Sequence, residues 1–493
     1  MKMVKGLFLG SAAALVAMSG AQAADLPLKA KAVEYVKVCS IYGAGFYYIP
    51  GTDTCIKLGG YLRADATLYG SSNYNAPAWN GAAGAKSRLA NNTIMYMRQD
   101  INIDTRTATE YGVVRTYFDA NFNWGSGGAV GGSTGIANGG LGVYYAFIQF
   151  AGFTFGKAVS QFDTPWTGYP GNNTSFLIGG YDDVTGINQV SYTAQFGNGV
   201  SAAISLEDQS AYLQSALYNV SGLTNAGFAT GVYGTSSYAG TSIPDIVGQL
   251  RVDQAWGLFQ LSAAAHQVRA SYYNTALETS GHPSDTWGYA VQGAISLKNL
   301  PTGPGDSINF TATYANGASR YVIGGVTGNS FSVYGSSNLG YQSIAIAAAA
   351  DGVFAGTDVT NGTGISKTTA WGVRGAFNHN WNPYWSTSLF GSYSSLEYGA
   401  TGRSLVCGAA TSVITGVGTC NPDFKIAQIG TVTRWTPVKN LTLSGEVMYT
   451  YIDQSNSGVV NLSAVSAVAK PAAAYEFKDL GVWSGNLRVQ RVF

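Results

Sequence analysis

The sequence predicts an all-β fold, a sixteen-stranded antiparallel transmembrane β-barrel, and three observations carry this prediction. Segments of about nine to fourteen residues alternate between apolar and polar side chains, which is the length that a tilted strand needs to cross a bilayer. Short and long connections between these segments also alternate along the chain. Finally, only 11% of the residues are charged, against roughly 25% in soluble proteins.

The chain begins with a segment that has the features of an export signal. Lys2 and Lys5 precede an apolar run of about twelve residues, which is too short to span a membrane as a helix. Ala21-Gln22-Ala23 offers a small-residue cleavage site, so we expect residues 1–23 to be removed. Their loss changes the formal net charge from +1 to −1, which argues against a nucleic-acid partner.

The four cysteines predict disulfides, because an exported chain meets an oxidising compartment. Pairing by proximity gives Cys39–Cys55 and Cys407–Cys420, and the other pairings stay open. No histidine lies within ten residues of any cysteine, so we expect no metal site. Residues 24–55 then form an N-terminal segment closed by a disulfide, and residues 56–493 form the barrel.

The first and last strands show the alternation most clearly. In the segment 56–69 one face carries Leu58, Leu62 and Leu68, and the other carries lysine, tyrosine, arginine and aspartate. The segment 483–493 ends on Phe493 and again separates apolar from polar positions. One face would meet lipid and the other would meet water inside the barrel.

The connections give the strand count. Short periplasmic links are expected near residues 107–111, 151–152, 196–199, 254–257, 299–305, 379–383 and 437–440. Long external loops are expected at 70–91, 125–141, 161–186, 208–244, 269–285, 316–366, 396–424 and 453–482. Seven hairpins supply fourteen strands, and one strand before them and one after them bring the count to sixteen. With an even number of strands the sheet can close without leaving an unpaired edge in lipid. The apolar segment Ser343–Phe354 could form a seventeenth strand. An odd number of strands would break the alternation of short and long connections, so we place this segment in a long external loop.

Many charges fall on the inward-facing positions, and a sealed core cannot hold so many ionised groups. We therefore expect a water-filled lumen whose wall carries the basic residues Arg63, Arg98, Arg115, Arg251 and Arg374. The stretch between Ala158 and Leu250 has no lysine or arginine. Its loop 161–186, after the fifth strand, holds Asp163, Asp182 and Asp183. Either this loop folds into the lumen and sets its acids against wall arginines, or it is a solvated external loop.

Enzyme motifs are scarce. The three histidines lie on separate segments, and the one G-x-S-x-G string, around Ser133, has no helix after it to form a nucleophile elbow. We expect no catalytic residue, no cofactor and no chemical reaction.

Several motifs, in order along the chain, resemble the alphaproteobacterial general porins. They include Tyr35-Val-Lys-Val-Cys39, Pro50-Gly-Thr-Asp-Thr-Cys55, Arg251-Val-Asp-Gln-Ala-Trp-Gly257 and Arg488-Val-Gln-Arg491. The resemblance covers nearly the whole mature chain. It implies a homotrimer in the outer membrane of a Gram-negative cell, in contact with outer-membrane lipids, through which small hydrophilic solutes and ions diffuse passively.

The resemblance also implies that a long loop in the first half of the barrel folds inward as a constriction. The constriction residues would be Asp163, Asp182 and Asp183, opposite wall arginines such as Arg63, Arg98 and Arg115, with a weak preference for cations. Arg491 departs from the pattern, because it occupies an apolar position of the last strand. The long loop 316–366 suggests an external cap or a narrowed entrance.

Two other functions remain open. The barrel could be a membrane anchor that displays its loops for binding or adhesion, in which case a plugged lumen would barely conduct. It could also be a substrate-specific channel, but the loop has no basic ladder for phosphate and the wall has no continuous run of aromatics for sugars.

Overall fold

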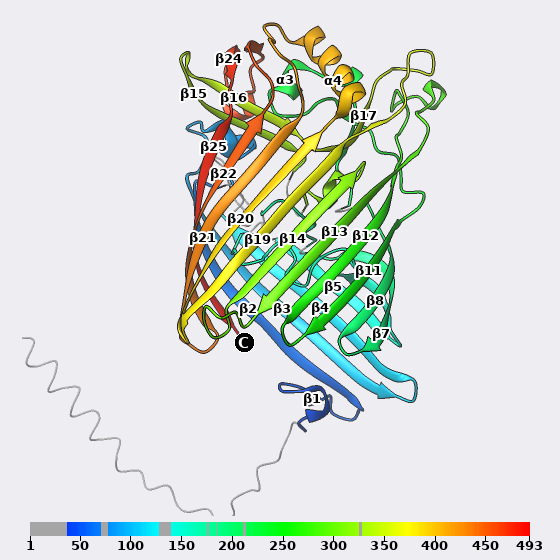
Figure 1. Ribbon diagram of the computed structural model, residues 1–493, viewed down its shortest axis with the longest axis vertical. Helices are drawn as coiled ribbons and strands as arrows, with labels where there is room; N and C mark the ends of the chain where they lie inside the picture. Colours follow the sequence, from blue (N-terminus) through cyan, green and yellow to red (C-terminus); the bar gives the residue numbers. More distant parts are fainter. Residues whose placement is uncertain are drawn as a thin grey trace, which may run out of the picture.

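The computed structural model describes residues 37–70, 77–127, 140–174, 177–183, 185–210, 213–324 and 328–493. Within them, one antiparallel sheet of 17 strands closes into a barrel (Figure 1). The two-residue β1 (Tyr47–Tyr48) pairs with the start of β2, and the other sixteen strands form the ring. The expected signal 1–23 and the loop that carries Ser133 lie outside the described residues.

The ring follows the order of the chain, and each strand pairs with its neighbours in antiparallel register. β25 pairs with β2 from Tyr61↔Val492 to Leu68↔Gly485, so the first and last strands close the barrel. The predicted count of sixteen is confirmed. The ring strands are β2 (Thr54–Leu68), β3 (Thr93–Thr109), β4 (Gly112–Gly125), β5 (Gly140–Phe150), β6 (Phe153–Ala158), β7 (Ile187–Gly197), β8 (Val200–Glu207), β11 (Asp245–Gln254), β12 (Gly257–Val268), β13 (Thr286–Lys298), β14 (Ser307–Asn316), β19 (Thr369–Asn382), β20 (Trp385–Glu397), β21 (Phe424–Val438), β22 (Leu441–Gln454) and β25 (Leu480–Val492).

The period-2 pattern separates the two faces of the barrel as the sequence predicts. In β2, Leu62 and Leu68 are exposed on the outer surface, whereas Arg63, Asp65 and Thr67 are buried on the inner side. Large apolar side chains on the outside cost nothing in a bilayer, because lipid rather than water surrounds them.

The short turns lie at the lower end of the barrel in Figure 1. Two of them have two residues, Ala151-Gly152 and Asn198-Gly199, and all four residues have positive φ (50°, 86°, 50° and 74°). This is the backbone of a type I′ turn, whose twist matches that of the strands it joins. At the same end Arg491, the unusual residue of the last strand, donates to the carbonyl of Lys439 and so keeps its charge at the rim.

The N-terminal segment is fastened to the barrel by a disulfide. Cys39 and Cys55 are bonded (S–S 1.98 Å), and Cys55 lies inside β2, so the barrel begins at Thr54. Together with η1 (Ser40–Tyr42), the segment packs around Phe46, over which the guanidinium of Arg106 lies at 4.9 Å. The segment therefore sits beside the lower opening, as β1 shows in Figure 1.

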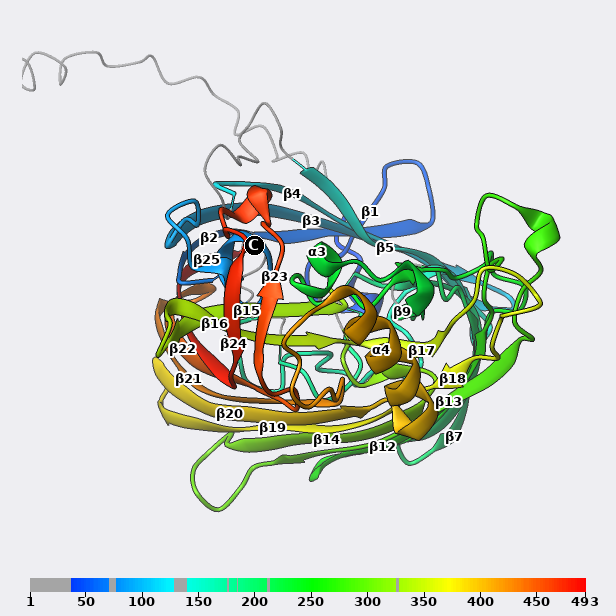
Figure 2. The ribbon, with the colours of Figure 1, turned by 90° about the horizontal axis from the view of Figure 1, so that it is seen from above.

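The opposite end carries a folded structure that we call the loop cap: the described parts of residues 208–244, 317–368, 398–423 and 455–479. It contains two four-stranded sheets, in the orders β10-β9-β17-β18 and β15-β16-β24-β23. Their strands are β9 (Ala216–Asn219), β10 (Thr235–Ser236), β15 (Ser330–Ser337), β16 (Gly340–Ala348), β17 (Ala350–Phe354), β18 (Ser366–Lys367), β23 (Val459–Leu462) and β24 (Ala473–Phe477). Seen from above, the cap extends across the opening (Figure 2).

The segment Ser343–Phe354 lies in this cap, as expected, and supplies most of β16 and all of β17 rather than a strand of the ring. The helices are short: α2 (Gly81–Ala85), α3 (Asn225–Phe228), α4 (Gly399–Val413), η3 (Val220–Gly222), η4 (Glu278–Ser280), η5 (Ser319–Tyr321) and η6 (Ser466–Val468). Among the described residues, no helix is long and apolar enough to cross a membrane.

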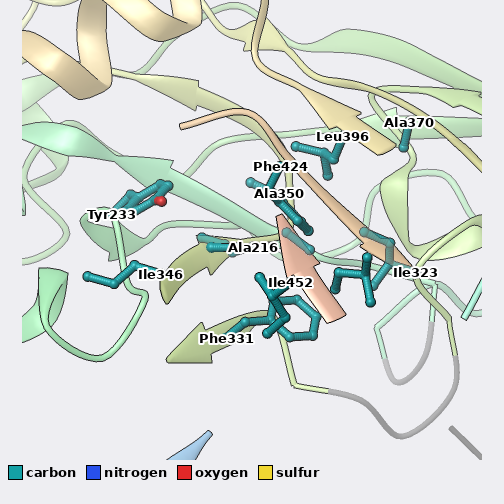
Figure 3. Close-up of a cluster of buried hydrophobic side chains, with 14 of the residues drawn as sticks. Ala216, Tyr233, Ile323, Phe331, Ile346, Ala350, Ala370, Leu396, Phe424 and Ile452 are labelled. Carbon is teal, nitrogen blue, oxygen red and sulfur yellow. The ribbon is translucent and has the colours of Figure 1, made fainter. Parts of the chain in front are cut away.

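A single apolar core joins the cap to the upper ends of the ring strands. Phe331, Ile346 and Ala350 of the cap strands lie beside Phe424 and Ile452 of β21 and β22 (Figure 3). All five side chains are almost completely buried. Because burial of apolar area stabilises folding by about 25 cal/mol per Å², the cap is a packed part of the molecule, and it covers the β19–β22 side of the opening.

Candidate functional site

The acidic loop lies inside the barrel. We call residues 159–186 the inner loop; they follow β6, the fifth strand of the ring. Amide side chains from three successive strands donate to its backbone. Gln249 Nε2 lies 2.6 Å from the carbonyl oxygen of Gln161, and Gln260 Nε2 lies 2.7 Å from that of Asp163. Gln292 Nε2 lies 2.8 Å from the oxygen of Phe162.

The same arrangement continues along the wall. Asn309 of β14 and Asn378 of β19 both donate to the carbonyl oxygen of Pro170, at 2.6 and 3.1 Å. Arg434 of β21 donates to the carbonyl oxygen of Gly171 at 2.6 Å. The amide of Asn173 donates to a carboxylate on β22, and its side chain donates to Ser444 Oγ at 2.8 Å. The inner loop therefore follows the wall from β11 to β22.

Arg374 of β19 is the central anchor of the inner loop. Its side chain is completely buried. Its guanidinium donates to the carbonyl oxygens of Leu177 and Thr167, both at 3.1 Å, and to that of Tyr181. Asp163 Oδ1 lies 4.0 Å from Nη2. A Cβ on Gly180 would lie 3.1 Å from Arg374 Nε, so a glycine here lets the loop approach the guanidinium closely.

The three acids of the inner loop are buried, with exposed fractions of 0% for Asp163, 2% for Asp182 and 1% for Asp183. The backbone N–H of Asp183 donates to Asp163 Oδ2 at 3.2 Å, so the two acids lie next to each other. Burial and the neighbouring charge of Asp182 raise the pKa of Asp163 to about 7, and burial together with Asp163 raises the pKa of Asp183 well above its usual value. The pair therefore retains a proton at neutral pH, and the charge that remains faces Arg374.

Residues of the cap hold the inner loop from the other side. The rings of Phe162 and Tyr321 have centroids 4.5 Å apart, and those of Tyr181 and Tyr321 are 5.2 Å apart. The amide of Gly179 donates to the carbonyl of Val322 at 3.1 Å. The inner loop is thus fixed between the wall and the cap.

The remaining wall, formed by β25 and β2 to β4, carries arginines in pairs around single carboxylates. Asp65 lies 2.7 Å from Nε of Arg63 through one oxygen and 2.7 Å from Nε of Arg488 through the other. Asp104 of β3 likewise lies 2.9 Å from Arg106 and 3.0 Å from Arg115, and both guanidinium side chains are 29% exposed. Each cluster has two cations and one anion, so each carries excess positive charge.

The other predicted wall residues also lie on the inner side. Arg98 Nε donates to Asn123 Oδ1 at 2.7 Å, and its guanidinium lies 5.2 Å over the ring of Tyr144. Arg251 donates to Gln260 Oε1 at 3.1 and 2.8 Å, next to the point where Gln260 holds the inner loop. Among the five predicted basic residues, the structure thus places Arg374 beneath the inner loop and the other four on the wall.

The sequence reasoning missed the amides that hold the inner loop: Gln249, Gln260, Gln292, Asn309 and Asn378. Each occupies an inward-facing position on one of five consecutive ring strands. That recurrence is the signal that could have identified them.

The second disulfide stabilises the cap rather than the lumen. Cys407 lies within α4 and is bonded to Cys420 (S–S 1.99 Å), which closes the segment that returns from the helix to β21. Both pairings expected by proximity are therefore present.

Comparison with known proteins gives a consistent result. The family profile described as the porin subfamily matches residues 25–486. Porin Omp2b of Brucella abortus (strain 2308) is 34% identical over 312 residues, which cover 60% of this chain and 75% of that protein. Porin Omp2b of Brucella suis biovar 1 is 34% identical over 313 residues, with the same coverage.

Among solved structures, the outer membrane channel DcaP of Acinetobacter baumannii has a similar fold. It superimposes with a TM-score of 0.56 at 15% sequence identity, over 90% of this chain and 99% of that one.

Proposed function

We propose how solutes pass through this chain, which belongs to the porin subfamily and is an outer-membrane channel for passive diffusion. Solutes would cross between the inner loop on one side and the wall of β25 and β2 to β5 on the other. The observation that carries this proposal is the hydrogen bonding of the inner loop to the wall from β11 to β22. The loop occupies that half of the cross-section. It faces the other half, whose wall carries the arginine pairs around Asp65 and Asp104.

The charges that reach water in this passage favour anions. The weak cation preference expected from the sequence depends on exposed acids in the inner loop, but Asp163, Asp182 and Asp183 are buried. The wall cluster around Asp104 carries one excess positive charge on arginine side chains that are 29% exposed, whereas the arginines beside Asp65 are only 9% and 12% exposed. Rings of arginine and lysine select for anions in other pores, so we propose a mild anion preference.

We also propose that three copies assemble, as the resemblance to general porins implies. An apolar groove of about 580 Å³ lies on the outer surface of the wall formed by β2, β3, β22 and β25. Its lining includes the small and flexible side chains of Ala64, Ala66, Met95 and Met97, with Trp385 and Trp435 of β20 and β21 at its side. The first and last strands could therefore meet a second copy closely. Cross-linking of the refolded protein in detergent should give a trimer, and a species that stays monomeric would contradict this assignment.

The diffusion proposal is tested by swelling of liposomes that contain refolded residues 24–493. Small sugars should enter at rates that fall steeply with their size, because the passage is water-filled and has no binding step. Liposomes that do not swell with any sugar would favour the alternative of a plugged anchor that acts through its external loops. A rate that saturates for one sugar alone would favour a substrate-specific channel.

A further inference from the structure

A pocket on the outer surface lies at the level where the barrel wall meets the external loops. Its volume is about 700 Å³. Tyr69, at the end of β2, and Trp483, on the outer face of β25, form part of its wall, and both are 62% exposed. Directly below, Leu68 and Leu487 belong to the lipid-facing surface of the barrel. Tyrosine and tryptophan at this level are typical of the membrane–water interface, so the pocket opens where lipid headgroups lie.

The polar side of the pocket is basic. Lys86 and Arg88 line it, and both come from the connection between β2 and β3. Lys86 follows α2 in a left-handed conformation (φ 50°, ψ 34°), and its Nζ lies 3.5 Å from the carbonyl oxygen of Gly481 on β25. This contact holds the ammonium group at the rim of the pocket, above Trp483.

A third cation lies close by. Burial and the charge of Lys86 lower the pKa of Lys470, and burial lowers the pKa of Lys86. The helix η6, two residues before Lys470, packs against α2, which ends one residue before Lys86, so the two lysines lie at the same rim. The Nζ of Lys470 also lies 4.6 Å over the ring of Tyr334. These are the conditions under which a bound anion stabilises both cations.

No protein carboxylate supplies that anion in the part of the chain that the structure describes. Lys86, Arg88 and Lys470 form no ion pair there. Within the described ranges, the positive charge at this rim is therefore not balanced by a paired carboxylate.

We propose that this pocket binds the phosphorylated headgroup of a lipid in the outer leaflet, with Lys86, Arg88 and Lys470 contacting phosphate oxygens and Tyr69 and Trp483 contacting the first carbons of the lipid. Arginine and lysine are the residues that bind phosphate in proteins. The concave shape distinguishes this site from a merely basic surface, because it surrounds a headgroup on two sides. The site is separate from the lumen, so it stands whether or not the pore conducts as proposed.

The test is native mass spectrometry of the refolded assembly of residues 24–493 in a non-ionic detergent, titrated with diphosphoryl lipid A. The triple variant K86Q/R88Q/K470Q should bind more weakly by about fivefold for each cation removed, hence on the order of 100-fold in all. The matched control K57Q/K298Q/K439Q loses the same charge at the other end of the barrel and should bind as the parent does.

Three further outcomes decide the chemistry. Lipid A from which the phosphates have been removed should bind the parent as weakly as intact lipid A binds the triple variant. If the parent bound both forms of lipid A with the same affinity, the phosphate assignment would be overturned. Inorganic phosphate at the same concentration should not displace the lipid, and displacement would overturn the lipid assignment. A triple variant that binds as the parent does, or that changes the number of copies in the assembly, would overturn the proposal in favour of an interface between copies.

Discussion

Replacing Arg374 should release the inner loop without unfolding the barrel. The guanidinium donates to three buried carbonyl oxygens of the loop and faces Asp163, whereas the strand that carries it, β19, keeps all its backbone pairing. Arg374→Met preserves the length of the side chain and removes every one of those donors.

The magnitude follows from the contacts. Removing one partner of a buried, hydrogen-bonded charge costs roughly 3–5 kcal/mol. About 4 kcal/mol corresponds to a change on the order of 1,000-fold in the ratio of seated to released loop. A loop that is released for a measurable part of the time widens the passage and makes its width fluctuate.

Single-channel recording in planar bilayers measures both effects. R374M should show a larger mean conductance and more open-channel noise than the parent. R434M should show a smaller change, because Arg434 donates to one backbone carbonyl of the loop, that of Gly171, and to Asn173 Oδ1 at 3.3 Å. R403M is the matched control, since Arg403 of α4 pairs with Asp423 within the cap. An R374M channel with the conductance and noise of the parent would refute the anchoring role.

Three other perturbations test separate parts of the structure. Burial raises the pKa of Asp163 to about 7, so the seated loop binds a proton that a released loop gives up near pH 4. Seating should weaken as pH rises between these values, so noise should be greater at pH 8 than at pH 5. D163N should reduce that difference without removing it, because the pKa of Asp183 is raised as well, and an unreduced difference would contradict the role given to Asp163. R106Q/R115Q removes the two exposed cations of one wall cluster and should move the reversal potential toward cation preference, whereas an unchanged potential would show that these side chains do not face the passage. C407S/C420S removes a disulfide that spans 13 residues and contributes roughly 3 kcal/mol to stability. The cap should become sensitive to protease, while the barrel keeps its mobility on gels. A cap as resistant as that of the parent would contradict the role given to this disulfide.

The barrel could be predicted from the sequence because two solvents impose its pattern. Lipid outside and water inside require alternation along each strand, so the faces of β2 could be assigned from Leu62 and Arg63 alone. The alternation of short and long connections then fixed the count, and it correctly kept Ser343–Phe354 out of the ring.

The contacts of the inner loop could not be predicted in the same way, because a loop has no period. The sequence shows that Asp163 and Asp183 are acidic, but not that they are buried and share a proton. Arg374 was expected among the basic residues of the wall, but its partners are carbonyl groups more than 190 residues away in the chain. The amides Gln260 and Gln292 look like ordinary wet residues until the register of the strands places them beside the same loop.

The cap shows a second limit. Its length suggested a cover over the opening, but its sheets join segments that are distant in the sequence. β17 pairs in parallel with β9, and β16 pairs in parallel with β24. No local pattern in the sequence specifies such pairs.

The most direct test of the account is the reversal potential of refolded residues 24–493 in a planar bilayer under a gradient of potassium chloride. We expect open channels whose reversal potential has the sign of a mild anion preference, because Arg106 and Arg115 around Asp104 face water and the acids of the inner loop are buried. A reversal potential with the sign of cation preference, or a folded barrel that does not conduct, would contradict it.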